Sequence, residues 1–299
     1  MPQQERVSFV TGANGFVGSF VTKRLLEEGI RVRALARRPE AAAAVRSLGA
    51  EPVRGSMTEP ISLREALSGA HYVVHCAATG SDDMAEAMAI NATGTATLVE
   101  AAKASGCERF VHISTLGVYD LEGRELIDES TPMVTTTGWA YAASKAEAER
   151  HVLEAIRQGL PAVILRPPAI LGVHPTSTWG HTVPQSIAAG RFAVAGNGEY
   201  HFFYVHVRNL AEAVLLCLRS QAAVGHAFDI VDGHVTWRHY AEHFRSGPLA
   251  TMPESQAPAF MRTRARFPGE KARKLLGYAP RYSFEEVMRE TQQSLSTHR

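Results

Sequence analysis

The sequence has few of the features that mark secreted, membrane-spanning or disulfide-bonded proteins. Its 299 residues include three cysteines, Cys76, Cys107 and Cys217, which are widely spaced in apolar stretches. No CxxC or Cys/His spacing indicates a metal site, so we expect no metal and interpret the thiols as small core residues. The polar start of the chain predicts no signal peptide, and no apolar run approaches the roughly 20 residues of a membrane span. We therefore expect a cytoplasmic protein.

An excess of charge of one sign is also absent. The chain carries 31 lysines and arginines against 30 aspartates and glutamates, a net charge of +1. No overall field favours nucleic acid or a membrane as partner, so we expect a small-molecule substrate, with a homodimer left open. A basic cluster near the C-terminus is either solvated surface or a binding site for an anionic part of the substrate. It consists of Arg262, Arg264, Arg266, Lys271, Arg273 and Lys274.

Strand-like and helix-like segments alternate along the first two thirds of the chain. This βαβ alternation predicts a parallel sheet covered by helices on both faces. Right-handed crossovers favour a doubly wound, Rossmann-like α/β fold. Strands are predicted at 6–10, 31–36, 51–54, 71–76, 109–114, 161–166 and 226–231, and helices at 16–28, 40–48, 61–68, 84–105 and 139–158.

Proline and glycine become frequent after residue 167, which indicates a change of architecture. We expect residues 1–167 to form a dinucleotide-binding domain, to which 205–235 returns. Residues 168–204 and 236–299 are expected to form a small C-terminal lobe that binds the substrate. Three helices are predicted there and in the returning segment, at 207–220, 236–244 and 283–294.

A glycine-rich stretch, Thr11-Gly-Ala-Asn-Gly-Phe-Val-Gly18, stands between the first predicted strand and helix. Gly12 allows a tight turn, Gly15 lets the backbone approach a pyrophosphate, and Gly18 lets helix and strand pack closely. The phosphates then meet the free N–H groups and the positive end of the helix. This context favours dinucleotide binding over a bare structural turn. The residues expected at the phosphates are Gly12, Asn14, Gly15, Phe16, Val17 and Gly18.

This motif resembles the opening of the extended short-chain dehydrogenase/reductase family, of the epimerase/dehydratase type. The resemblance extends from residue 7 to about 235 and weakly to the C-terminus. It implies a Rossmann-like sheet, a nicotinamide dinucleotide and hydride transfer.

The end of the second predicted strand indicates which dinucleotide binds. NAD enzymes usually carry an acidic residue there, about 20 residues beyond the glycines, which takes the adenosine ribose hydroxyls. This chain has Arg37 and Arg38 at that place, and no Asp or Glu lies between Glu28 and Glu40. Because a guanidinium group fits a 2′-phosphate, we predict NADP(H), with NAD as the alternative.

The resemblance implies three further groups of cofactor contacts. Ser56 and Met57 stand where related sequences usually carry an aspartate that meets the adenine. Asn91 is expected near the nicotinamide-side ribose, or else is a helix cap. The chain is expected to pass close to the cofactor after the fourth strand and to touch the carboxamide after the sixth. Those two segments are Cys76, Ala77, Ala78 and Thr79, and Pro168, Ala169 and Ile170.

Tyr141-Ala-Ala-Ser-Lys145 is the predicted catalytic pair, because residues four apart share one face of a helix. An ammonium group beside the phenol would lower its pKa from about 10 toward working pH, so that Tyr141 can pass a proton. Lys145 can also hold the nicotinamide ribose. Aligned on the family pattern through Val118-Tyr119, Thr115 supplies a catalytic hydroxyl that stabilises developing charge, or else caps the strand.

Two further segments bear on the reaction. Leu116-Gly117 stand where related sugar dehydratases carry Asp-Glu, so dehydration is not expected. The segment 192–207 contains no Lys or Arg for a nucleotide-sugar pyrophosphate, and its aromatics, Tyr200, Phe202 and Phe203, form either an apolar wall or core. We therefore predict an NADP-dependent oxidoreductase that interconverts a carbonyl and a secondary alcohol on a compact, mostly uncharged substrate. The alternatives are a nucleotide-sugar epimerase and a non-catalytic dinucleotide sensor.

Overall fold

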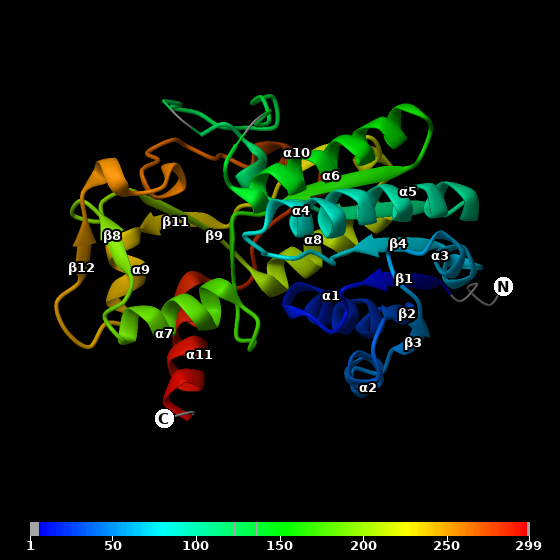
Figure 1. Ribbon diagram of the computed structural model, residues 1–299, viewed down its shortest axis with the longest axis horizontal. Coiled ribbons are helices and arrows are strands. Elements are labelled where there is room, and N and C mark those ends of the chain that lie inside the picture. Colours follow the sequence, from blue (N-terminus) through cyan, green and yellow to red (C-terminus); the bar gives the residue numbers. More distant parts are fainter. Residues whose placement is uncertain (1–5, 122, 136, 298–299) are drawn as a thin grey trace.

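A seven-stranded parallel sheet forms the centre of the molecule (Figure 1). The computed structural model describes residues 6–121, 123–135 and 137–297. Neighbouring strands pair in parallel in the order β10-β6-β5-β4-β1-β2-β3, which confirms the doubly wound, Rossmann-like fold. The strands are β1 (Val7–Thr11), β2 (Arg31–Ala36), β3 (Glu51–Arg54), β4 (Tyr72–His75), β5 (Arg109–Ile113), β6 (Ala162–Arg166) and β10 (Ala227–Asp229).

Helices cover both faces of this sheet, and each face has its own hydrophobic core. Side chains alternate between the faces of a strand, so Phe9 enters the core under α3, α5 and α6 while Val10 enters the core under α1 and α8. Both are fully buried, and burying such a side chain contributes about 1.5–3 kcal/mol. The helices are α1 (Phe16–Glu27), α2 (Pro39–Ser47), α3 (Pro60–Leu67), α4 (Met84–Ala87), α5 (Gly94–Ser105), α6 (Ala140–Arg157) and α8 (Val207–Arg219).

The helix predicted at 84–105 is continuous but not uniform. A π-helical turn, Met88–Thr93, separates α4 from α5. Asp83 begins the run, because its side chain accepts a hydrogen bond of 2.8 Å from the backbone N–H of Glu86. The π turn brings Asn91 toward the carboxyl end of β4, as described below.

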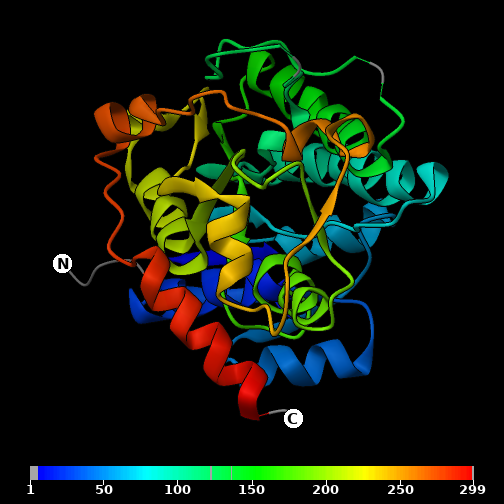
Figure 2. The ribbon, with the colours of Figure 1, turned by 90° about the vertical axis from the view of Figure 1, so that its left-hand side faces the viewer.

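The C-terminal part adds two small sheets and four helices, which the sequence indicated only in part. In Figure 1 most of these elements lie to the left of the large sheet, and Figure 2 shows them from that side. One sheet has the order β11-β9-β7, and the other pairs β12 with β8. Their strands are β7 (Ala169–Leu171), β8 (Ala193–Ala195), β9 (His201–His206), β11 (Gly233–Thr236) and β12 (Ala250–Met252). The helices are α7 (Val183–Ala188), α9 (Trp237–Glu242), α10 (Glu270–Leu276) and α11 (Phe284–Thr297).

A separate core holds these C-terminal elements together. It joins Leu171, Phe202, Tyr240 and Val287, from β7, β9, α9 and α11. The helix α10 instead packs on the core of the large sheet through Ala272. The division of the chain into domains stays a prediction. No helix in the described part of the chain is both long and apolar enough to cross a membrane.

Single short turns complete the chain: η2 (Leu116–Val118), η3 (Thr178–Thr182), η4 (Gln221–Ala223), η5 (Glu254–Gln256) and η6 (Ala259–Met261).

Candidate active site

A cavity of about 980 Å³ lies along the carboxyl ends of the parallel strands. The residue that directly follows each of β1, β2, β3, β4, β5 and β6 lines it. Ligands of open α/β sheets bind at this edge, where the crossovers change direction. All of the predicted site residues except Asn91 line this cavity.

The glycine turn after β1 forms one wall of the cavity. Gly12 has a φ of +72°, and a Cβ there would lie 2.7 Å from the backbone N of Ala77. A Cβ on Gly18 would lie 2.0 Å from the carbonyl oxygen of Gly12, so α1 can approach β1 only with glycine at this position. Gly15 differs, because only that carbonyl lies near its missing Cβ, at 3.3 Å, and the residue lines the cavity. A side chain at Gly15 would therefore fill a cradle at the uncapped N-terminus of α1, and this cradle suits a phosphate.

The residues that follow β2, the strand beside β1, bring positive charge to the cavity. Arg37 and Arg38 are exposed, line the cavity and form no ion pair with any described carboxylate. Glu86 is the one acidic residue among the described lining residues. Ser56 and Met57 lie nearby, and the Met57 methyl group packs where a Cβ on Gly94 would stand, 2.8 Å away. These residues fit a dinucleotide whose adenosine end carries an additional anion.

Asn91 lies behind the cavity wall and is 2% exposed. Its Oδ1 accepts a hydrogen bond of 2.7 Å from the Thr79 N–H, and its Nδ2 donates to the Thr79 carbonyl and to Ser144 Oγ at 3.0 Å each. The helix-cap alternative is wrong, because the helical run begins seven residues earlier, at Met84. Asn91 fixes the loop after β4 to α6 and thereby holds the cavity-lining residues of that loop in place.

Thr115, Tyr141 and Lys145 meet at the centre of the cavity. Tyr141 and Lys145 stand one turn apart on α6, and Thr115 follows β5. Thr115 lies close enough to Tyr141 to influence its phenol, and Thr115 Oγ1 accepts a hydrogen bond of 3.1 Å from the Gly117 N–H. Lys145 is 2% exposed, and its Nζ donates a hydrogen bond of 2.7 Å to the Ile113 carbonyl. The end of β5 therefore supports both the hydroxyl pair and the ammonium group.

The pKa of Tyr141 differs from the expectation. Burial raises this pKa above its ordinary value, and the Thr115 side chain offsets the rise only in part. The predicted lowering by Lys145 is wrong for this arrangement, because the ammonium group is directed to the Ile113 carbonyl. Burial also lowers the pKa of Lys145 to about 8, against the opposing effect of Glu149. The phenol is thus protonated at neutral pH and suited to donate a proton.

A buried polar network supports the strand ends beside this centre. Ser114 Oγ donates a hydrogen bond of 2.6 Å to Glu149, and Arg166 Nε donates to the same carboxylate at 2.9 Å. Arg166 also donates to the Tyr119 hydroxyl, which donates to Asp229 at 2.8 Å. All five side chains are buried. The network ties the ends of β5, β6 and β10 to α6 and so fixes Ser114, the residue directly before Thr115.

Aromatic side chains line the half of the cavity that faces the C-terminal elements. Trp139 and Phe260 stack with ring centroids 5.6 Å apart, and Trp179 and Trp237 lie at the same distance. From residue 168 onward, the described lining residues include no carboxylate, lysine or arginine. This half of the cavity is therefore shaped for an apolar ligand. The aromatic residues are Trp139, Trp179, Phe202, Phe203, Trp237, Phe260 and Phe267.

Several sequence-based interpretations of this region change. Phe202 and Phe203 line the cavity and also belong to the buried cores, so both interpretations hold for them. Tyr200 does not line it, and its ring instead lies 4.6 Å from the guanidinium carbon of Arg264. None of the six residues of the basic cluster lines this cavity. Three of them border a separate hollow together with carboxylates: Arg266, Lys271 and Lys274 with Asp128, Glu129 and Glu270.

Sequence reasoning missed most of the aromatic wall. Trp139, Trp179, Trp237 and Phe260 come from four separate segments, and no local pattern connects them. The position of Trp139, two residues before Tyr141, was the available signal. Its ring lies 5.8 Å from that of Tyr141, so it borders the predicted catalytic phenol.

Comparisons with known proteins agree with this geometry. The model of the NAD-dependent epimerase/dehydratase family matches residues 8–231. The chain belongs to this family. Its members use a nicotinamide dinucleotide and include oxidoreductases and epimerases.

Individual relatives in the epimerase/dehydratase family include several reductases. The chain is 35% identical over 230 residues to 4-hydroxy-2-methyl-3-oxo-4-farnesyl-3,4-dihydroquinoline-1-oxide ketoreductase of Stigmatella aurantiaca, covering 76% of this chain and 68% of that protein. It is 28% identical over 249 residues to dihydroflavonol 4-reductase of Solanum lycopersicum, covering 75% and 65%. Among solved structures, UDP-glucose 4-epimerase of Thermotoga maritima has a TM-score of 0.82 at 22% identity, covering 98% and 99%. That last likeness shows the shared fold.

Proposed function

We propose that this protein is an NADP(H)-dependent oxidoreductase that interconverts a carbonyl and a secondary alcohol on an uncharged, ring-containing substrate. The observation that carries the proposal is the distribution of charge around the cavity. Positive side chains gather at the adenosine end and at Lys145, whereas the C-terminal half offers an aromatic wall. Burying a charged group against such a wall without a partner would be costly. A neutral ring system would gain from the same contacts.

The curated relatives support this class of substrate. The ketoreductase of Stigmatella aurantiaca is named for a dihydroquinoline oxide and the tomato reductase for a dihydroflavonol. A 3-beta-hydroxysteroid dehydrogenase of Mycolicibacterium neoaurum is 28% identical over 329 residues, covering 94% of this chain and 89% of that protein. All three names describe a fused ring system that bears an oxygen function.

Each catalytic residue has a role in the reductive direction. Tyr141 would donate its phenolic proton to the substrate oxygen as the alcohol forms, and its raised pKa keeps that proton in place beforehand. The Thr115 hydroxyl would stabilise negative charge on the same oxygen. Lys145, which lines the cavity, would hold the nicotinamide ribose. When bound, the nicotinamide cofactor supplies the hydride.

Dehydration is disfavoured by the backbone after Thr115. A Cβ on Gly117 would lie 3.3 Å from the ring of Trp139, so an acidic side chain at this position would press on the indole and require it to shift. Epimerisation of a nucleotide sugar is disfavoured because the described lining residues beyond the cofactor half include no lysine or arginine for a diphosphate. The basic cluster, which was the remaining source of such a cation, lies outside the cavity.

The preference for NADP(H) rests on Arg37 and Arg38. Both line the cavity, both are exposed, and neither is paired with a described carboxylate. A 2′-phosphate would be held by charge-assisted hydrogen bonds that a ribose hydroxyl does not replace. We also propose that the protein acts in the cytoplasm, in keeping with its three free thiols.

Thermal unfolding and cofactor consumption together test this function. The cofactor-loaded protein is screened with neutral polycyclic ketones and with UDP- and dTDP-sugars. We expect a neutral ketone to raise the melting temperature and to consume NADPH stoichiometrically. Tyr141→Phe should keep cofactor binding but lose turnover by ~100-fold or more. A shift produced by a nucleotide sugar, without net loss of NADPH, would instead establish an epimerase.

A further inference from the structure

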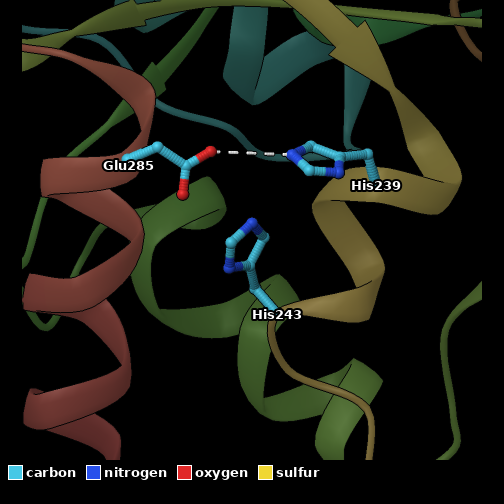
Figure 3. A group of neighbouring side chains, drawn as sticks. All are labelled: His239, His243 and Glu285. Carbon is cyan, nitrogen blue, oxygen red and sulfur yellow. Dashed lines mark ion pairs between the residues drawn. The ribbon is translucent and has the colours of Figure 1, made fainter.

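Two histidines and a glutamate converge between α9 and α11 (Figure 3). His239 lies on α9, and His243 follows one turn later, where the backbone is still helical. Glu285 stands in the first turn of α11. One ligand atom from each residue lies within 4.8 Å of the others, and His239 Nε2 is 3.7 Å from Glu285 Oε1. The three side chains therefore already face a common point.

Packing between α9 and α11 holds this arrangement in place. The buried ring of Phe284 lies 5.6 Å from the His239 ring and 5.5 Å from the His243 ring. Gln292 on α11 donates a hydrogen bond of 2.7 Å to the His243 carbonyl. The Ser283 hydroxyl and Glu286 form a capping box, which leaves the neighbouring Glu285 side chain free of the helix cap. A ligand could bind here without moving either helix.

The donor set has the chemistry of a zinc site. Two imidazoles and one carboxylate are a common three-residue set for Zn²⁺, with a fourth position left for water. Histidines four apart on a helix present both rings to one side, as such sites require. Glu242 adds negative charge near His243, and the His243 ring packs against the rings of His239, Phe244 and Phe284. A cation would replace one weak His–Glu ion pair by three ligand bonds.

We propose that His239, His243 and Glu285 form a binding site for a divalent transition-metal ion, with Zn²⁺ as the favoured ion, that ties α9 to α11. The site is independent of the proposed function, since none of its ligands lines the active-site cavity. It is linked to the cavity through α9, whose first residue, Trp237, belongs to the aromatic wall. The metal is thus a clamp that stiffens the substrate side of the molecule.

Zinc binding is measured on the untagged full-length protein after treatment with a chelator and dialysis. The probe is ZnCl₂ alone, and the readouts are the zinc content per chain after equilibrium dialysis and the melting temperature. We expect one zinc ion per chain and a higher melting temperature than in the zinc-free protein. His243→Ala and Glu285→Gln should each lose the bound ion, by more than the ~10- to 100-fold that outer-shell partners contribute to affinity.

His151→Ala is the matched control. His151 Nε2 lies 3.8 Å from Glu147 on α6, so it forms the same kind of pair without a third described ligand. This variant should bind zinc as the wild type does. Glu285→Gln keeps the side-chain volume, so this variant should fold. Its zinc content therefore tests the proposal even if His243→Ala does not fold. Absence of zinc binding by the wild type, retention of zinc by Glu285→Gln, or an equal loss in His151→Ala would each overturn the proposal.

Discussion

Replacing Glu149 by glutamine should destabilise the protein strongly although the two side chains have the same shape. The Glu149 carboxylate is fully buried and accepts hydrogen bonds from Ser114 and from the Arg166 side chain, which is 5% exposed. The amide would leave the guanidinium charge uncompensated, and breaking a buried pair in this way costs about 3–5 kcal/mol. Glu149 also raises the pKa of Asp229, which burial brings to about 8. Burial is the main cause of that rise and Glu149 a small one, so Asp229 would stay largely protonated without Glu149, and we expect a cost of about 3–5 kcal/mol.

Urea unfolding followed by circular dichroism measures this change. Glu154→Gln is the matched control, because Glu154 lies on the same helix and pairs with Arg157 while both side chains are more than half exposed. Such a surface pair contributes about 0–1 kcal/mol, so the control should unfold almost as the wild type does. If Glu149→Gln also lost less than about 1 kcal/mol, the network would not carry the stability assigned to it. Glu149→Gln should in addition lower turnover more than it lowers the affinity for the cofactor, because the polar network ends beside Thr115.

The combined change Arg37→Asp and Arg38→Ala should weaken the binding of NADP(H) more than the binding of NAD(H). Each lost charged hydrogen bond should cost ~1.5–3 kcal/mol, and we expect the lower end of that range because both arginines are exposed. Calorimetric titration with both cofactors measures this, and equal affinity of the wild type for the two would contradict it. Acid should also destabilise the protein, since burial lowers the pKa of His75 to about 3 and of His206 to about 4. The unfolded chain, with histidines near pKa ~6.5, binds more protons below that pH, so each histidine costs about 2 kcal/mol between pH 6.5 and 5. Urea unfolding at pH 7 and 5 should show a smaller loss for His206→Gln than for the wild type, and an equal loss would refute this assignment.

The large sheet was predictable because each of its segments carries its own signal. The ranges expected for β2 and β3 match the structure, and those of the other five strands differ by one or two residues. The short strands of the C-terminal part carry no such signal. β8 and β12 have three residues each, and their pairing joins Ala193 to Ala250, far apart in the sequence. A strand of that length is defined by its partner rather than by its own periodicity.

The candidate site likewise has features that the sequence predicts and features that only the folded structure reveals. The glycine turn and the spacing of Tyr141 and Lys145 are local patterns, and the structure brings these residues to one cavity. The pKa of Tyr141 was not predictable, because it depends on the direction of the Lys145 ammonium group, which the Ile113 carbonyl determines. For the proposed metal site, the spacing of His239 and His243 was visible in the sequence, whereas the third ligand became apparent only when α11 was placed beside α9.

The two halves of the cavity place different constraints on the chain. In the cofactor half, Gly12 and Gly18 face backbone atoms at 2.7 and 2.0 Å, so a side chain at either position would have to displace a strand end. In the substrate half, the wall consists of side chains such as Trp139, which is 41% exposed and stacks on Phe260. An exposed ring can be exchanged for another without moving the backbone that carries Tyr141. Under the proposed function, substitutions of exposed wall residues such as Trp139 should therefore alter which substrate is accepted, and substitutions at the strand ends should alter whether any is converted.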